Sequence, residues 1–456
     1  MAIGQGRVPS LFEPEHCGAS NEGKAGFSDP AFAGNKTAPV HRWVPWIAGY
    51  SCDFVRQALD RYLDSEGTVL DPFCGVGTTL VEAALRGHNA TGFEINPYAA
   101  LASRVKANWA SIDEGALMEE IAEFARFYSE RSSDPSHRPE STIPDGFRTR
   151  SEFYSPSVLR KVLIVRDYIK RIEDDRLRGV FRLAFGSTMV SYSNYSYEPS
   201  LGARASCGKP NIADYPVGEA ITAKLREVIG DVRWMGRRVS RHPPAVRVFE
   251  ASFFGYRNFI PPASADLLVT SPPYLNNYHY VRNTRPQLFW LDFVATPRDL
   301  RKLEVGNFGK FWQTVRDKAH VGMEFELPGS DLDEVLAEIR QINGHRGVYG
   351  GNGWANYAAS YFNDCYRFAQ GIRYSLRAGG TALVVLGNSI IQGVTVPTDV
   401  YFGQIAEAAG LTLVSIHVPR PSRVGSSIVN SGARLGAGDK RRLYEAVVEI
   451  RNDRGA

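Results

Sequence analysis

The sequence has few cysteines and no long apolar run. Its five cysteines are scattered over 456 residues and form no C-x-x-C pair. This argues against a disulfide framework and against a structural zinc site, so we expect no metal. No stretch approaches the roughly 18–20 apolar residues that a membrane-spanning helix needs. The N-terminal segment lacks the basic and apolar parts of a secretory signal, and a reducing cytoplasm is the expected location.

The chain also has little excess of either charge. Lys and Arg number 53 and Asp and Glu number 49, which gives a formal net charge of +4. This balance is compatible with a nucleic-acid partner but does not by itself indicate one. A chain of this length can bury a large core and form two or three structural units.

Alternating strand and helix patterns predict an α/β fold. Residues 68–97 read as a strand, a glycine-rich turn, a helix and a second strand, which is one βαβ unit. Further strand patterns follow a long helical segment, at residues 245–250, 265–270, 379–388, 411–418 and 444–450. The pattern predicts a Rossmann-like, mostly parallel sheet that carries a large, mainly helical insertion.

The glycine-rich turn "DPFCGVG" has the layout of a cofactor site. Gly75 and Gly77 permit a positive φ and a close approach of the backbone, and the helix that begins near Thr78 directs free N–H groups at a ligand. Glu94 ends the next strand, where a carboxylate can accept hydrogen bonds from both hydroxyls of a ribose. A structural turn without any ligand is the alternative.

The spacing of this turn excludes the commonest phosphate-binding motifs. It does not match G-x-G-x-x-G, and no lysine follows Gly77 as a P-loop requires. Asp71 would repel a phosphate but suits the amino group of an amino acid. A cationic nucleoside that carries an amino acid, such as S-adenosylmethionine, therefore fits better than NAD or ATP.

The stretch "TSPPY" ends a later strand abruptly. Pro272 and Pro273 cannot donate to a strand ladder, and they hold the backbone in a rigid, extended path. They fix the Ser271 hydroxyl and nearby carbonyl oxygens as acceptors, while Tyr274 offers a flat ring. Acceptors beside a stacking surface suit the exocyclic amine of a base, which must be flipped out of duplex DNA to reach them.

Together these motifs resemble those of S-adenosylmethionine-dependent DNA amino-methyltransferases, which methylate cytosine N4 or adenine N6. "LDPFCGVGTT" is similar to the family's cofactor motif, "GFEINP" to its ribose-binding strand and "TSPPY" to its catalytic motif. Residues 41–59 resemble the segment that precedes the cofactor motif and packs near the methionine end. The segment between the two motifs is where one class of the family keeps its target-recognition domain.

The resemblance implies a role for each matching residue. The catalytic, base-holding residues would be Ser271, Pro272, Pro273 and Tyr274. The cofactor-binding residues would be Asp71, Pro72, Phe73, Gly75, Gly77, Thr78, Glu94 and Glu250. A Ser-Pro-Pro motif occurs most often in cytosine-N4 enzymes, which favours that product over N6-methyladenine. An RNA base methyltransferase and a catalytically silent nucleic-acid-binding protein are the competing interpretations.

The predicted domains follow from the motifs and from where the alternation of strands and helices stops. The catalytic domain comprises residues 41–110 and 245–456, and it follows an N-terminal arm, residues 1–40. Residues 111–244 form the helical insertion, a candidate target-recognition domain. Residues 294–352 form a smaller, irregular insertion within the catalytic domain.

DNA is the implied partner, and a restriction endonuclease or another defence-system component is a candidate second partner. Clustered arginines can bind phosphates, and polar residues next to the catalytic motif can contact the strands. A solvated helix face, with Glu227 and Asp231 as local partners, is the alternative for the arginines. The predicted DNA-binding residues are Arg233, Arg237, Arg238, Arg241, Asn276, Tyr278 and Arg282.

Overall fold

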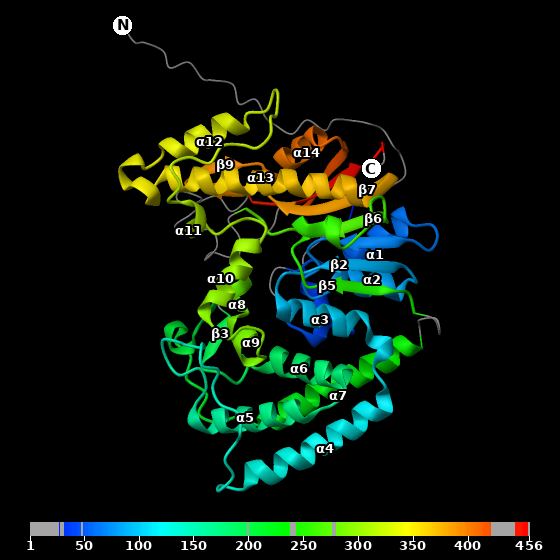
Figure 1. Cartoon of the computed structure of the whole chain (residues 1–456), viewed down its shortest axis with the longest axis vertical. Helices are drawn as coiled ribbons and strands as arrows, with labels where there is room; N and C mark the ends of the chain where they lie inside the picture. The colour runs from blue at the N-terminus through cyan, green and yellow to red at the C-terminus, as the bar shows by residue number, and fades with distance from the viewer. Residues whose placement is uncertain are drawn as a thin grey trace.

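A seven-stranded sheet forms the centre of the protein in a computed structural model (Figure 1). Its strand order is β10-β11-β7-β6-β1-β2-β5. The structure describes residues 27, 32–46, 49–197, 200–237, 243–275, 280–420 and 443–454. The strands of this sheet are β1 Thr68–Asp71, β2 Asn89–Phe93, β5 Val246–Phe249, β6 Ala265–Thr270, β7 Leu376–Gly387, β10 Thr412–Arg420 and β11 Glu445–Arg451.

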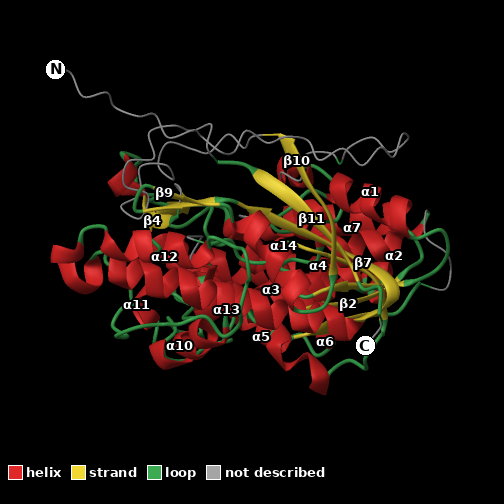
Figure 2. Ribbon diagram, turned by 90° about the horizontal axis from the view of Figure 1, so that it is seen from above, coloured by secondary structure: helices red, strands yellow, loops and turns green. Residues whose placement is uncertain are grey.

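The predicted Rossmann-like, mostly parallel sheet is confirmed. Strands β5, β2, β1, β6 and β7 pair in parallel, and β11 runs antiparallel to both β7 and β10. The long strands β7, β10 and β11 lie side by side (Figure 2). From β1 the chain continues to β2 and β5, which lie on one side of β1 in the sheet. It then crosses to β6 on the other side of β1, so the strand order reverses between β1 and β6. Ligands of open α/β sheets bind at the carboxyl ends of the strands at such a point.

Helices cover both faces of the sheet because its strands are apolar on both sides. On β6, Leu267 and Val269 pack into one core and Leu268 packs into the other. The first core contains α1 Cys52–Tyr62, α2 Thr78–Leu85 and α3 Pro97–Ala107. The second contains α13 Gly351–Ser375 and α14 Thr398–Ala408.

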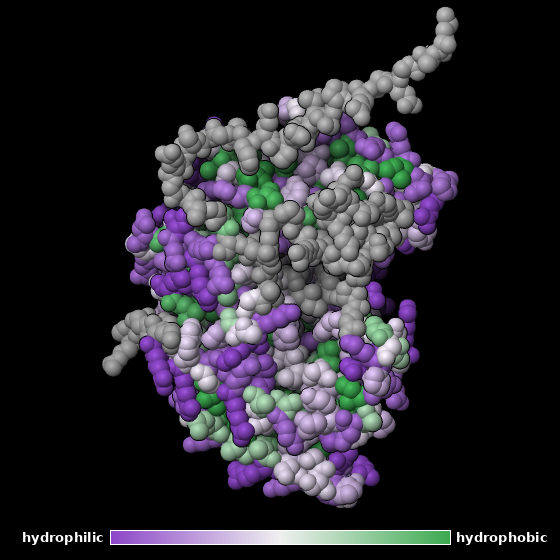
Figure 3. All heavy atoms as spheres, turned by 180° about the vertical axis from the view of Figure 1, so that it is seen from behind, coloured by the Kyte–Doolittle hydropathy of each residue, from purple (hydrophilic) through white to green (hydrophobic). Residues whose placement is uncertain are grey.

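The helical insertion lies below the sheet in Figure 1 and shares the core of α1–α3. The face of the insertion that Figure 3 shows is mostly hydrophilic, with small apolar patches. Its role in DNA recognition stays a prediction. Its elements are η3 Trp109–Ser111, α4 Glu114–Ser133, α5 Pro156–Arg171, α6 Asp175–Thr188, β3 Tyr195–Tyr197, β4 Leu201–Ala203, η4 Arg204–Cys207 and α7 Val217–Gly236.

The remaining elements surround the carboxyl edge of the sheet or precede α1. Residues 294–352, which we expected to be irregular, contain three short α-helices and one 3-10 helix. No helix in the described part of the chain is long and apolar enough to cross a membrane. These elements are η1 Phe32–Lys36, η2 His41–Trp43, η5 Phe253–Asn258, α8 Tyr280–Asn283, α9 Arg285–Trp290, α10 Pro297–Gly306, α11 Trp312–Val315, α12 Leu332–Gln341, η6 Gly344–Tyr349, β8 Ser389–Ile391 and β9 Val394–Val396.

One buried carboxylate on α7 joins the insertion to the segment before α1. Asp231 accepts hydrogen bonds from the Val40 backbone N–H at 2.8 Å and from Trp43 Nε1 at 2.8 Å. It also forms an ion pair with Arg42, in which Nη2 lies 2.5 Å from Oδ1. In the described part of the chain, Asp231 is therefore a partner of this segment and not of Arg233 or Arg237.

We predict that Asp231→Ala lowers the free energy of unfolding by about 3–5 kcal/mol, because it leaves buried donors without an acceptor. Urea denaturation followed by tryptophan fluorescence measures the change. Asp60→Asn is the control, because Asp60 forms a surface ion pair with Arg86 and such pairs contribute about 0–1 kcal/mol. Equal denaturation midpoints for both variants would contradict the assigned role of Asp231.

Candidate active site

A pocket of about 900 Å³, including its open mouth, lies at the carboxyl ends of β1, β2 and β6. This is the point where the strand order reverses, which is where open α/β sheets bind their ligands. Residues from both predicted motifs meet here although about 200 positions separate them. The predicted residues that line the pocket are Pro72, Phe73, Gly75, Thr78, Glu94, Ser271 and Pro273.

The glycine-rich turn has the backbone conformation that its glycines predict. Gly75 has a φ of 50° and Gly77 a φ of 84°, both in the left-handed region. A Cβ atom on Gly77 would also lie 2.6 Å from Ser103 Oγ on α3, so this position excludes any side chain. Gly77 does not itself line the pocket, but it begins α2 and brings Thr78 to the pocket wall.

A buried lysine, which the sequence did not indicate, supports the backbone of this turn. Lys106 on α3 donates a hydrogen bond from Nζ to the Val76 carbonyl at 2.7 Å. Burial lowers the pKa of Lys106 to about 7. A lysine near the end of a helix is ordinarily exposed, so its sequence position gave no sign of this contact.

Glu94 lines the pocket from the end of β2, as its position predicted. Its Oε2 accepts from the Gly75 N–H at 2.9 Å and its Oε1 from the Asn96 N–H at 2.7 Å. Burial raises the pKa of Glu94 to about 7. The two backbone bonds fix the carboxylate and leave each oxygen a further lone pair for a ligand hydroxyl.

Asp71 does not line the pocket; it is fully buried behind the pocket wall. Its carboxylate accepts from the Phe73 N–H at 3.1 Å, from Thr79 Oγ1 at 2.7 Å, from Thr270 Oγ1 at 2.6 Å and from the Tyr50 hydroxyl at 3.0 Å. Burial raises the pKa of Asp71. Through these hydrogen bonds Asp71 connects the glycine-rich turn to the end of β6.

The catalytic motif begins directly after Thr270. Ser271 and Pro273 line the pocket, whereas Pro272 is buried. The Tyr274 hydroxyl donates to Glu445 Oε1 at 3.1 Å. Its ring packs against the last residue of β7, because a Cβ atom on Gly387 would lie 3.0 Å from Cδ2 of the ring.

The structure does not bring Glu250 to the pocket. Its carboxylate forms an ion pair of 2.8 Å with Arg104, and both side chains are substantially exposed. Phe253, three residues later, lines the pocket instead and contacts Phe73 edge-on. Phe308 forms a similar contact with Phe73, so aromatic rings make one wall that the sequence analysis did not foresee.

Two of the predicted phosphate-binding arginines, Arg233 and Arg237, lie away from the pocket. Arg233 donates to Glu114 Oε1 from Nε at 2.7 Å, which ties α7 to α4. Arg233 and Arg237 line a shallow hollow with Trp109, which follows α3 and lies at the amino edge of the strands. The pocket lies at the opposite, carboxyl edge, so these two arginines do not border it.

Of the other predicted DNA contacts, only Arg282 can be placed. It is exposed on α8, between pocket residues Tyr280 and Val281 on one side and Asn283 on the other. Four predicted DNA-binding residues lie outside the described part of the chain, namely Arg238, Arg241, Asn276 and Tyr278.

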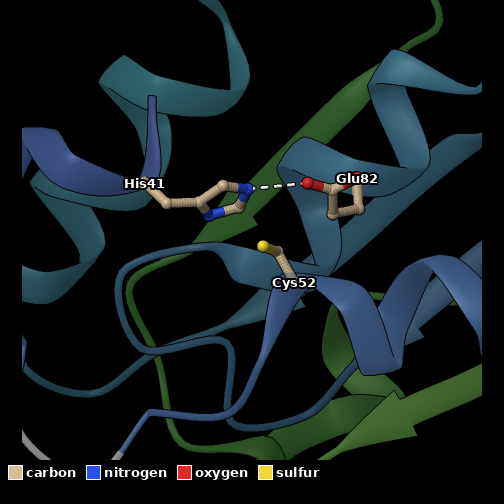
Figure 4. A group of neighbouring side chains, drawn as sticks. All are labelled: His41, Cys52 and Glu82. Carbon is tan, nitrogen blue, oxygen red and sulfur yellow. Dashed lines mark hydrogen bonds and ion pairs between the residues drawn. The ribbon is translucent and has the colours of Figure 1, made fainter. Parts of the chain in front are cut away.

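A buried group of His41, Cys52 and Glu82 resembles a metal site by composition (Figure 4). His41 Nε2 lies 2.8 Å from Glu82 Oε1. However, Arg56 donates to both oxygens of Glu82, at 2.9 Å each. A guanidinium therefore already satisfies the carboxylate that a cation would need, and we assign this group to a buried ion network that joins α1 to α2.

Comparison with known proteins connects these features to one family. The family model described as DNA methylase, of the N6/N4 type, matches residues 48–104. The Type II methyltransferase M.BsoBI of Geobacillus stearothermophilus is 23% identical over 436 residues, which cover 87% of this chain and 83% of that protein. The Type II methyltransferase M.AvaI of Nostoc sp. is 22% identical over 447 residues, which cover 91% and 87%.

Two further similarities are more limited. The Type II methyltransferase M.MvaI of Kocuria varians is 24% identical over 239 residues, which cover 49% of this chain and 50% of that protein. A solved rRNA methyltransferase from Streptomyces viridochromogenes aligns with a TM-score of 0.30 and 11% identity, over 93% of this chain and 94% of that chain. A score this low supports no conclusion about fold or substrate.

We predict that Asp71→Ala lowers the free energy of unfolding by about 3 kcal/mol, because a buried N–H and several hydroxyls lose their shared acceptor. Urea denaturation of the full chain measures it. Asp64→Ala is the matched control, because Asp64 is exposed and surface changes of this kind stay within about 0.5 kcal/mol. If Asp71→Ala unfolds at the same urea concentration as the control, the hydrogen bonds of Asp71 do not stabilise the connection between the glycine-rich turn and β6.

Proposed function

Because the chain resembles the DNA amino-methyltransferases of the N4/N6 family in its cofactor turn and across most of its length, we propose that it methylates an exocyclic amine in DNA. The proposed methyl donor is S-adenosylmethionine, and the proposed target is a flipped base in a specific sequence, with cytosine N4 as the product site. Adenine N6 is the second candidate, because both bases present an exocyclic amine.

The observation that carries this proposal is the meeting of two motifs in one pocket. Glu94 and the glycine-rich turn form one part of the lining, and Ser271 and Pro273 form another. A donor held by the first part and a base held by the second would be in contact. Direct methyl transfer needs mainly such proximity and alignment.

The donor groups of the pocket fit S-adenosylmethionine. Glu94 would accept from the ribose hydroxyls, and the Gly75 turn permits close approach of a nucleoside. Phe73, Phe253 and Phe308 provide apolar surface for the adenine ring. When bound, S-adenosylmethionine supplies an electrophilic methyl group; the chain holds and orients the reactants and excludes water.

At the base-binding part, Ser271 Oγ and the backbone carbonyls of the Ser-Pro-Pro segment would accept the N–H groups of the base. These bonds direct the nitrogen lone pair away from the protein and toward the donor. The Ser-Pro-Pro form of the motif favours cytosine N4. Arg282 is exposed and follows the pocket residues Tyr280 and Val281, and we propose it as a contact to a DNA phosphate.

The partner proposed besides DNA is a cognate restriction endonuclease, because the similar proteins named above are Type II methyltransferases. The competing enzyme class is a methyltransferase of RNA bases. A catalytically silent nucleic-acid-binding protein is the third interpretation, and the presence of both Ser271 and Glu94 in one pocket argues against it.

The test of this function is mass spectrometry of nucleosides from DNA and RNA incubated with the protein and isotopically labelled S-adenosylmethionine. We expect labelled N4-methylcytosine in DNA with the wild type and at least a tenfold loss with Ser271→Ala, since one hydrogen bond to the reacting amine is about 1.5 kcal/mol. Labelled N6-methyladenine would correct the base. Label in RNA alone, or none in either, would refute DNA methylation.

Glu94 makes a second prediction, about the pH dependence of cofactor binding. Its ionised carboxylate accepts hydrogen bonds on both oxygens, whereas protonation turns one oxygen into a donor and weakens the acceptor that a ligand hydroxyl needs. Burial raises the pKa of Glu94 to about 7. The affinity for S-adenosylmethionine should therefore fall as the pH drops below about 7, by up to about tenfold per pH unit. Glu94→Gln should weaken binding about tenfold and remove this pH dependence.

Calorimetric titration at several pH values measures both effects. Glu250→Gln is the control, because Glu250 lies outside the pocket and should keep the affinity and pH dependence of the wild type. An unchanged pH profile in Glu94→Gln would show that Glu94 does not hold the ribose.

A further inference from the structure

A carboxyl group from a distant part of the chain reaches the catalytic motif. Glu445 begins β11 and pairs in register with Gly387, the last residue of β7. It therefore lies at the same edge of the sheet as Ser271. Its Oε1 accepts from the Tyr274 hydroxyl at 3.1 Å. Glu445 is partly buried, and no Lys or Arg side chain in the described part of the chain forms an ion pair with it.

The direction of the hydrogen bonds follows from the chemistry of the three side chains. An ionised carboxylate can only accept, so the Tyr274 hydroxyl must donate its proton to Glu445. The Tyr274 oxygen is then free to accept, and Ser271 Oγ donates to it over 3.5 Å. This distance is long, but such bonds in ligand-free sites tighten when the reactants bind. The lone pairs of Ser271 Oγ remain available to a substrate amine.

Methylation of an exocyclic amine releases a proton. The nitrogen gains a methyl group and a positive charge and must then lose one of its hydrogens. We propose that Ser271, Tyr274 and Glu445 form a proton relay that carries this hydrogen from the methylated amine to the Glu445 carboxylate. The inference rests on the proposed function, because it assumes that the substrate amine binds at Ser271.

The relay balances in atoms and charge. The N–H bond of the methylated amine breaks, and a new O–H bond forms at Ser271 Oγ. The original proton of Ser271 passes to the Tyr274 oxygen, and the proton of Tyr274 passes to Glu445. The base becomes neutral and Glu445 becomes a neutral acid, which returns its proton to solvent after the product leaves.

The surroundings of Glu445 suit it as the end of the relay. Burial raises its pKa, so it holds a proton more readily than an exposed glutamate does. The pKa of Tyr274 is also raised, by burial and then by the charge of Glu445, so Tyr274 stays neutral and passes on one proton as it receives another.

Among the described residues, Tyr280 on α8 and Tyr361 on α13 act on Tyr274. The hydroxyl of Tyr444, the neighbour of Glu445, donates to Asp399. Arg420 stands opposite Glu445 on β10, and its side chain lies outside the described part of the structure. Among the described groups, burial raises the pKa of Glu445 and the hydrogen bond from Tyr274 opposes that rise.

The alternative role for Glu445 is only to hold the Tyr274 ring against Gly387. Glu445→Gln separates the two, because glutamine has the same size and its carbonyl still accepts from Tyr274, but it cannot take up a proton. Tyr274→Phe is a second variant, which keeps the ring and removes the relay. Glu449→Gln is the control: Glu449 lies on the same strand and bonds to Ser415 at 3.0 Å, away from the motif.

The experiment is single-turnover methyl transfer across a range of pH, with labelled S-adenosylmethionine and a DNA substrate that the wild type methylates. The relay predicts that the wild-type rate falls toward acid pH as Glu445 becomes protonated. Glu445→Gln should lower the rate about a hundredfold and remove this acid limb, with unchanged calorimetric affinity for S-adenosylmethionine. Tyr274→Phe should lower the rate and lose the acid limb in the same way as Glu445→Gln. Glu449→Gln should keep the wild-type rate and pH profile.

The other outcomes are distinguishable. If the wild type methylates DNA and Glu445→Gln keeps its rate and pH profile, the relay is refuted and the proposed function stands. A variant that loses cofactor affinity or thermal stability but keeps the acid limb would assign Glu445 a structural role and also refute the relay. If the wild type methylates nothing, the proposed function and the relay fail together.

Discussion

The buried carboxylate of Asp71 is the interaction on which the arrangement of the site depends. It accepts hydrogen bonds from the Phe73 N–H of the glycine-rich turn, from Thr79 on α2, from Thr270 at the end of β6 and from Tyr50 before α1. A single side chain thereby fixes the carboxyl ends of β1 and β6, between which the strand order reverses. The glycine-rich turn and the Ser-Pro-Pro-Tyr segment can share one pocket because these ends are held in place.

Two further carboxylates, both partly buried, lie at this edge of the sheet. Glu94 holds the Gly75 turn through its backbone N–H and faces the pocket from β2. Glu445 holds Tyr274 from β11 and lies behind the catalytic motif. Burial raises the pKa of both, so their protonation should couple the proposed reaction to pH. One carboxylate would govern the binding of the donor and the other would receive the proton that the reaction releases.

The sequence predicted the local structure of the site well and its long-range contacts poorly. Residues 78–85 form a helix as predicted, and the glycine spacing correctly indicated positive φ values, because both depend on neighbours in the chain. The resemblance to the methyltransferase family implied a cofactor role for Glu250, but the structure pairs Glu250 with Arg104, a contact that depends on how α3 packs. Glu445 could not be foreseen, because it meets Tyr274 only through the antiparallel entry of β11 beside β7.

The central proposal is that the pocket at the carboxyl ends of β1, β2 and β6 binds the methyl donor. Photo-cross-linking with an azido-adenine analogue of S-adenosylmethionine, followed by peptide mapping, tests it directly. The account predicts labelled peptides that contain Phe73, Phe253 or Phe308, and competition by unmodified S-adenosylmethionine. If the labelled peptides contribute no residue to this pocket, and unmodified S-adenosylmethionine still prevents their labelling, the donor binds elsewhere and the proposal is wrong.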